Sequence, residues 1–221
     1  MKSLKITILT DNPNSWIIPY VEELKQELIQ HKITHVFLST DIPKGDVMLI
    51  LGCEKILKPE FLTKHKTNIV IHPSKLPKGK GFSPLAWQII EGLNIIPVTL
   101  FEAVEKVDAG EIYLVDQIEL RGDELNNEIK HQQGLITKKM VKMYINSIST
   151  KPEEIKGIPQ EGEDTFYPRR TLESSELDVN LSIKKQFNIL RVVDNERYPA
   201  YFKYMGEKYI IKIYKEDENK P

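Results

Sequence analysis

The chain has 221 residues, of which 40% are hydrophobic and 29% are charged, with 31 Lys and Arg residues against 32 Asp and Glu residues. This composition is typical of a folded globular protein, and a net charge of -1 gives no general positive surface for nucleic acid. The single cysteine, Cys53, excludes an intrachain disulfide and a cysteine-based zinc site. No apolar run approaches the roughly 18 residues of a membrane span, and the N-terminus lacks a signal-peptide pattern. We therefore expect a cytoplasmic protein without membrane or nucleic-acid partners.

The first part of the chain alternates short apolar runs with helical periodicity. Residues 4–10 are predicted as a buried strand, and the polar residues 11–16 as a turn. Apolar residues then recur at helical spacing from Ile17 to Ile29, which requires Pro19 to lie in the first helical turn. Further strands are predicted at residues 34–39, 47–51 and 68–72, with a short helix around residues 59–61.

The next part of the chain continues this alternation. Ser83 and Pro84 are typical of the N-cap and first residue of a helix, which we expect to run to Glu91 with Gly92 as its C-cap. Strands are predicted at residues 96–101 and 111–120, and a long helix at residues 123–148. The alternation predicts an α/β core over residues 1–150, with a Rossmann-like, open, mostly parallel sheet and helices on both faces.

The composition changes after this core. Residues 151–164 are polar and contain several Pro and Gly residues, which predicts a linker. Residues 165–221 are predicted to form a small appendage, with one amphipathic helix near residues 183–191 and a β-hairpin of residues 201–204 and 209–214. The aromatic hairpin can pack on its own core or form a homodimer surface.

Two polar side chains are predicted at the edge of the sheet where ligands bind. In open α/β sheets this edge is formed by the carboxyl ends of the strands, which places residues 11–16, 52–53, 72–81 and 107–110 there. Within these segments, His72 and Asp108 carry groups suited to proton transfer. Each alone is more often a capping or turn residue. An Asp beside a His raises the imidazole pKa, however, and such a pair suits acid–base catalysis near neutral pH.

Several motifs resemble those of the N10-formyltetrahydrofolate-dependent formyltransferases. They are HPSKLP at residues 72–77, Gly81, and DAG at residues 108–110, and the resemblance covers most of residues 1–120. The tail, which begins YPRRTLESSELD at residues 167–178, is most similar to the short sugar N-formyltransferases of nucleotide-sugar and nonulosonic-acid pathways. A methionyl-tRNA formyltransferase is expected to have a larger C-terminal domain.

The resemblance implies that N10-formyltetrahydrofolate, a co-substrate, gives its formyl group to the primary amine of an amino sugar that is linked to a nucleotide. No metal is implied. His72 and Asn68 would stabilise the oxyanion, and Asp108 would orient His72 and help move the amine proton. The family usually has Asn two residues before this His, where this chain has Val70. The oxyanion donor is therefore left open between Asn68, protonated His72 alone, and a loop amide.

The resemblance also implies binding residues. The folate slot would be lined by Leu51, Gly52, Cys53, Ile56, Leu57 and Gly81. The sugar or nucleotide side would be formed by Asn12, Asn14, Trp16, Lys78 and Lys80, and the loop amides of Asn12 and Asn14 are the alternative oxyanion donors. Cys53 is interpreted as a small buried apolar residue rather than a nucleophile.

Three alternatives accompany this hypothesis. A formyltetrahydrofolate hydrolase would use water in place of the amine, and the aliphatic Val70 favours it. A non-catalytic folate- or partner-binding module on the same scaffold is the second, although the presence of both His72 and Asp108 opposes it. A Rossmann dinucleotide enzyme is disfavoured because no GxGxxG motif follows the first strand.

Overall fold

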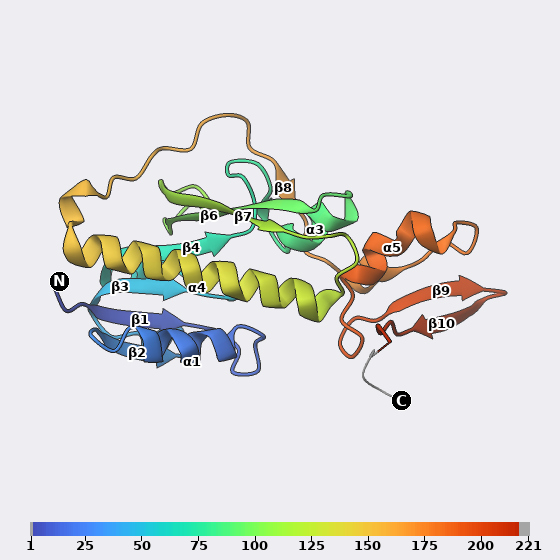
Figure 1. The fold of residues 1–221 in the computed structure, drawn as a ribbon, viewed down its shortest axis with the longest axis horizontal. Coiled ribbons are helices and arrows are strands. Elements are labelled where there is room, and N and C mark those ends of the chain that lie inside the picture. The colour runs from blue at the N-terminus through green and yellow to red at the C-terminus, as the bar shows by residue number, and fades with distance from the viewer. Residues whose placement is uncertain (1, 217–221) are drawn as a thin grey trace.

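The structure is a computed structural model that describes residues 2–216. It is built around one six-stranded sheet (Figure 1). In spatial order its strands are β2 (Lys32–Val36), β1 (Lys5–Leu9), β3 (Gly45–Ile50), β4 (His65–His72), β6 (Ile95–Glu102) and β7 (Ile112–Glu119). The first four run parallel, whereas β6 and β7 are each antiparallel to their neighbours. The predicted Rossmann-like, mostly parallel sheet is confirmed, and the direction of the strands changes at β4.

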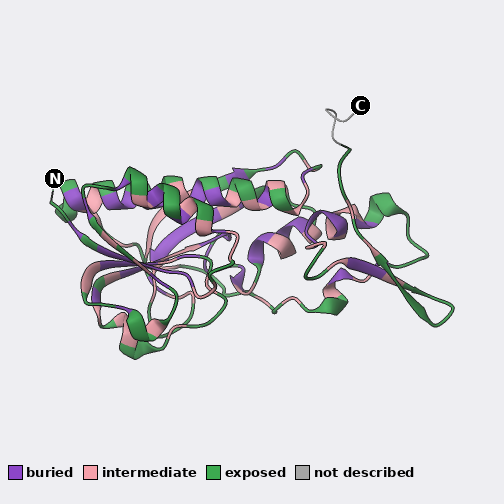
Figure 2. Cartoon of the chain, turned by 90° about the horizontal axis from the view of Figure 1, so that it is seen from below, coloured by how far each residue is buried: buried purple, intermediate pink, exposed green. Residues whose placement is uncertain are grey.

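Most of the helical surface packs on one face of the sheet. The main apolar cluster joins the sheet to α1 (Ile18–Glu27), α3 (Pro84–Ile90) and α4 (Asn126–Thr150), which is drawn above the sheet in Figure 2. A smaller cluster on the other side of β1 and β3 includes the short α2 (Pro59–Leu62). None of the helices within residues 2–216 is long and apolar enough to cross a bilayer.

The predicted helix boundaries are close to those observed, and the differences have local causes. Pro19 lies in the first turn of α1, as its ring requires. Ser83 occupies the N-cap position of α3 and Pro84 the first helical position, but Ser83 has a left-handed backbone and its side chain makes no capping hydrogen bond. The helix α4 passes through Gly134 without a break, and the glycine leaves room for the Tyr20 ring of α1, which a Cβ at that position would approach to 2.3 Å.

Residues 151–164, predicted as a linker, run along the core and make specific contacts with it. After a 3-10 turn at Pro152–Glu154, Ile158 exchanges two backbone hydrogen bonds with Ile112 of β7. Asp164 forms an ion pair with Lys80, with the two charged atoms 2.7 Å apart. The chain then pairs as β8 (Phe166–Tyr167) with β5 (Lys80–Gly81). The segment is therefore attached to the core rather than free.

The C-terminal part contains the expected helix and hairpin. A 3-10 turn (Leu172–Ser175) leads to α5 (Ile183–Arg191), and β9 (Ala200–Tyr204) pairs with β10 (Glu207–Ile211). A third apolar cluster lies between these elements. We call residues 165–216 the tail. Figure 1 shows the tail beyond the carboxyl ends of β1, β3 and β4. The last residues of the predicted appendage, 217–221, lie outside the described residues, and the homodimer through the hairpin stays a prediction.

A buried ion pair joins the tail to the core. The Arg191 side chain at the end of α5 is 1% exposed, and its Nη2 lies 3.2 Å from the Glu124 carboxylate, which is 6% exposed. Its Nε donates to the Glu124 carbonyl, and its Nη1 donates to the side-chain oxygens of Asn94 and Asn188. Every nitrogen of this guanidinium therefore has an acceptor.

Candidate active site

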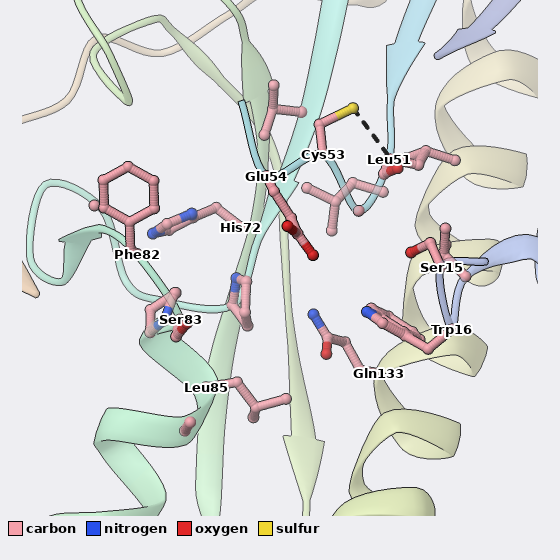
Figure 3. Close-up of a pocket in the computed structure, with 18 of the residues that line it drawn as sticks. Ser15, Trp16, Leu51, Cys53, Glu54, His72, Phe82, Ser83, Leu85 and Gln133 are labelled. Carbon is pink, nitrogen blue, oxygen red and sulfur yellow. Dashed lines mark hydrogen bonds between the residues drawn. The ribbon is translucent and has the colours of Figure 1, made fainter. Parts of the chain in front are cut away.

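A cavity of about 690 Å³ lies at the carboxyl ends of β1, β3 and β4. The starts of α3 and α4 and the tail complete its walls. In Figure 3 the side chains of Trp16, Glu54 and Gln133 point toward one another across it. Three of the four predicted edge segments lie where their parallel strands end. The fourth, which contains Asp108, follows the antiparallel strand β6 and reaches the cavity through the loop after that strand.

His72 is the last residue of β4 and lines the cavity with a ring that is almost fully buried. Its Nε2 lies 2.8 Å from the Gly79 carbonyl oxygen, which can only accept, so Nε2 carries the proton of this hydrogen bond. Phe101 packs edge-on against the ring. Because Nε2 is committed to Gly79, Nδ1 is the nitrogen that accepts a proton in the neutral ring and donates in the protonated ring.

Asp108 makes no hydrogen bond or ion pair with the His72 side chain, which corrects the predicted side-by-side pair. Its carboxylate accepts the Gly81 N–H at 2.9 Å, and Gln160 donates to its backbone carbonyl at 3.0 Å. Since β6 runs antiparallel to β4, its carboxyl end points away from this edge, and the loop after β6 brings Asp108 back. His72 and Asp108 thus hold the two ends of one short segment, Gly79 to Gly81.

Asn68 lies away from the cavity, which corrects its expected place at the reacting carbon. Its Nδ2 donates to the Leu62 carbonyl at 3.0 Å, and its backbone N–H donates to the Glu102 carboxylate at 2.6 Å. The bulge that would bring it closer is absent, because β4 keeps a regular register with β3 from Asn68 to Val70. Val70 itself lines the cavity. Of the open oxyanion donors, His72 and the loop amide Asn14 are the ones at the cavity.

The residues expected to form the folate slot all line the cavity. They are Leu51, Gly52, Cys53, Ile56, Leu57 and Gly81. The loop after β3 is fixed by Asp11, whose carboxylate accepts the N–H groups of Glu54 and Lys55. The Cys53 thiol donates to the Leu9 carbonyl, and burial raises its pKa to about 12. It stays protonated near neutral pH, as expected for a residue that packs rather than reacts.

The five residues expected on the acceptor side divide into two groups. Asn14 and Trp16 line the cavity, whereas Asn12, Lys78 and Lys80 do not. Asn12 instead accepts the N–H of Asn14 in a local turn. The Lys80 side chain is 3% exposed and paired with Asp164, because the pairing of β5 with β8 buries it. Lys78 is exposed on the loop.

Sequence reasoning missed the contribution of the tail to this cavity. The tail residues at the wall are Arg169, Arg170, Thr171, Ser175, Val192, Asp194, Arg197 and Tyr198. The Arg169 guanidinium lies 4.2 Å from the centre of the Phe82 ring and donates to the Glu54 carbonyl. Arg197 lies 3.8 Å from the Glu54 carboxylate. The sequence feature that could have indicated this contribution is the pair of adjacent arginines after Pro168, in a chain without excess charge.

The sheet changes strand direction after β4, and a buried histidine lines a cavity at its carboxyl edge. These are the features expected of a formyltransferase. Residues 8–145 match the family described as formyl transferase, and the chain belongs to this family. Within residues 2–216, no group of three or more His, Cys, Asp or Glu side chains is placed to hold a metal ion.

Among curated relatives, the chain is similar to the methionyl-tRNA formyltransferase of Borreliella burgdorferi (strain ZS7). The two are 32% identical over 148 residues, which is 65% of this chain and 46% of that protein. A second methionyl-tRNA formyltransferase, from Thermodesulfovibrio yellowstonii, is 28% identical over the same share of each chain. The chain spans about half the length of these curated relatives.

Solved structures share the fold over nearly the whole chain. Methionyl-tRNA formyltransferase from Clostridium thermocellum has a TM-score of 0.80 at 22% identity, covering 98% of this chain and 95% of that chain. HypX from Aquifex aeolicus in complex with tetrahydrofolic acid has a TM-score of 0.77 at 21% identity, covering 98% of this chain and 39% of that chain. A 4-N formyltransferase from Francisella tularensis has a TM-score of 0.69 at 19% identity, covering 97% of this chain and 98% of that chain.

Proposed function

We propose that the protein transfers the formyl group of N10-formyltetrahydrofolate to the primary amine of an amino sugar linked to a nucleotide. The observation that carries this proposal is one cavity with two different walls. The loop after β3 contributes the apolar side chains Ile56 and Leu57 beside the charged Glu54 and Lys55, the tail contributes several charged side chains, and the buried His72 lines the same cavity. A two-substrate transfer needs both surfaces at the reacting carbon.

The wall formed by the loop after β3 fits a flat, partly apolar heterocycle. Ile56 lines the cavity with a side chain that is 62% exposed, and a bound ring would cover it. Leu51 and Leu57 contribute further apolar surface, and Asp11 fixes the loop that carries them. The bound folate would supply the activated formyl group.

His72 is the group that we place at the oxyanion. Attack by the amine nitrogen on the formyl carbon leaves negative charge on the formyl oxygen, and a donor aimed at this oxygen contributes about 3–4 kcal/mol to lowering the barrier. Val70 offers no amide, so we assign this role to Nδ1 of His72, and the Asn14 amide is the other donor at the cavity. As the bond to the folate nitrogen breaks, the amine proton must reach that nitrogen, and Asp108 is the cavity carboxylate assigned to this transfer. Through Gly81 it also positions the loop that holds His72.

The amino sugar is supported by three observations. The tail motif resembles that of short sugar N-formyltransferases, and the 4-N formyltransferase from Francisella tularensis shares the fold over 98% of its chain, as the Clostridium methionyl-tRNA formyltransferase does over 95% of its own. A methionyl-tRNA acceptor needs a basic surface for the RNA backbone, and this chain has a net charge of -1. The nucleotide and the position of the amine are left to the experiment.

The proposal is tested with His72→Ala and Asp108→Ala, with His131→Ala as the matched control. His131 lies on the exposed side of α4 and bonds to Tyr20. Formylation of a panel of nucleotide-linked amino sugars is measured with N10-formyltetrahydrofolate. Loss of acid–base catalysis should lower the rate of each site variant about 10²–10⁴-fold, while the control keeps the wild-type rate.

The same assay separates the alternatives. Formate release at the same rate with and without an amine would identify a hydrolase. Formylation of methionyl-tRNA but of no amino sugar would replace the acceptor. Folate binding without any turnover would indicate a non-catalytic module. Folded site variants with wild-type rates would show that the assigned residues are wrong.

A further inference from the structure

Arg170 lines the cavity from the tail and has no carboxylate partner. Its Nη1 donates to the Val192 carbonyl at 2.9 Å, and its Nη2 reaches the Ser175 hydroxyl at only 3.5 Å. Its Nε is buried and has no hydrogen-bond partner. Within residues 2–216, no carboxylate oxygen lies within 4.0 Å of this guanidinium. The group keeps its charge near neutral pH, because an arginine side chain does not lose its proton in that range.

The neighbouring carboxylates are committed elsewhere. At the cavity wall, Asp194 lies 3.4 Å from Lys130, and Glu54 lies 3.8 Å from Arg197. Asp108 accepts the N–H of Gly81. Burial lowers the pKa of Arg170, with no nearby charge acting against it. An uncompensated cation held in this way is unfavourable unless an anion completes it.

Arg191 shows how this fold treats an arginine whose role is structural. Its guanidinium contacts the Glu124 carboxylate and carbonyl and two asparagine side chains, so that no nitrogen is left over. In Arg170, by contrast, the edge formed by Nε and Nη2 has only the long contact to Ser175. Nε is enclosed by the protein, so Nη2 is the nitrogen that can still bind an oxygen of a phosphate or carboxylate.

We propose that Arg170 binds an oxyanion of the amine acceptor, a phosphate or diphosphate. This inference rests on the proposed function, since it assigns a subsite to the acceptor of that reaction. Arg170 contacts Val192 and Ser175, both on the tail wall, whereas the adjacent Arg169 contacts Glu54 of the loop after β3. The oxyanion would therefore lie against the tail wall of the cavity. A glutamyl carboxylate of the folate is the other source of the same chemistry.

Binding of inorganic pyrophosphate to the full chain tests the subsite without any turnover. Isothermal titration calorimetry at constant ionic strength compares the wild type with Arg170→Gln and Arg170→Lys. Arg121→Gln is the matched control, because Arg121 is 70% exposed and does not line the cavity. We expect Arg170→Gln to weaken binding about 10- to 100-fold, Arg170→Lys to weaken it less, and the control to change nothing. Unchanged affinity in folded Arg170→Gln overturns the proposal, and if Arg170→Gln does not fold, Arg170→Lys with wild-type affinity does so.

Two further measurements identify the source of the oxyanion. Binding of 5-formyltetrahydrofolate is compared with binding of the analogue that lacks the glutamyl group. If Arg170→Gln weakens only the glutamyl form and leaves pyrophosphate binding unchanged, the acceptor assignment is wrong. In the formylation assay, Arg170→Gln should raise the acceptor KM about 10- to 100-fold and change kcat much less.

These outcomes also separate the inference from the function on which it rests. A wild-type protein that formylates an amino sugar, with an acceptor KM that does not depend on Arg170, overturns the subsite and leaves the function standing. A wild-type protein that formylates no amine but binds pyrophosphate through Arg170 supports the subsite as an anion site and removes the function.

Discussion

Replacing Arg191 by Met tests how strongly the tail is attached to the core. The Arg191 side chain is 1% exposed and the Glu124 side chain 6%, so the ion pair between them is withdrawn from water. Met fills a similar volume, but it leaves the Glu124 carboxylate without its buried counter-charge. Asn94 also loses its guanidinium donor.

The size of the effect follows from this burial. Removing one partner of a buried ion pair destabilises a protein by about 3–5 kcal/mol, mainly because a charge is left uncompensated. Glu124 keeps two backbone donors, the N–H groups of Arg121 and Gly122, so we expect a value near 3 kcal/mol. In a chain of this size each kcal/mol lowers the Tm by about 2–4 °C, which gives a decrease of about 6–12 °C.

Urea and thermal unfolding, followed by circular dichroism, measure this loss. The double variant Arg191→Met with Glu124→Gln removes the charge that the single variant leaves unpaired, so it should recover part of the stability. Lys25→Met, which disrupts an exposed pair with Glu22, is the control and should change the Tm little. A loss below about 1 kcal/mol in the single variant would refute the reasoning.

Three further results are expected. Cys53, with its pKa raised to about 12 by burial, should resist iodoacetamide at pH 8 in the native protein and react after denaturation, as followed by intact mass; rapid native labelling would contradict this. Gly110→Ala places a Cβ 1.8 Å from a backbone carbonyl oxygen, so it should lower stability by about 1–3 kcal/mol and reduce formyl transfer by displacing Asp108; an unchanged Tm and rate would disprove the close approach. The hydrogen bond from Lys80 lowers the pKa of Asp164, so its stabilising effect is complete above the ordinary Asp pKa and is lost as the pH falls through the lowered value. The Tm difference between wild type and Asp164→Asn should therefore shrink from pH 7 to pH 3, and a constant difference would exclude the ion pair as its cause.

Local patterns predicted the elements of the fold well but not the direction of every strand. The apolar runs, the position of Pro19 and the hairpin each depend on a short stretch of sequence, and the structure has elements at these places. An apolar strand buried on both sides reads the same in either direction, so the antiparallel pairing of β6 with β4 was not predictable. Likewise, a glycine inside a helix ordinarily weakens it, whereas Gly134 makes room for the Tyr20 ring.

The site residues that lie in one continuous segment were predicted, whereas those that come from distant segments were not. His72 and the loop after β3 follow directly from strand ends and motif, and the structure places them at the cavity. Asn68 was misplaced because face alternation says nothing about where along a strand the cavity begins. Arg169 and Arg170 lie more than a hundred residues beyond Glu54 and reach the cavity only after the chain has crossed the core, so local reasoning had no means to place them.

The path of residues 151–167 bears on how this scaffold can be recombined. A chimera that exchanges everything after residue 150 would replace Thr165, whose hydroxyl accepts the N–H of Gly79, and Asp164, which neutralises Lys80. Both belong to the support of the loop that accepts the His72 hydrogen bond. A junction after β8, near Pro168, keeps this support with the parent core and exchanges the arginines with the rest of the acceptor wall. Under the proposed function, the residues that would select the acceptor begin inside the tail, well after the boundary that composition suggests.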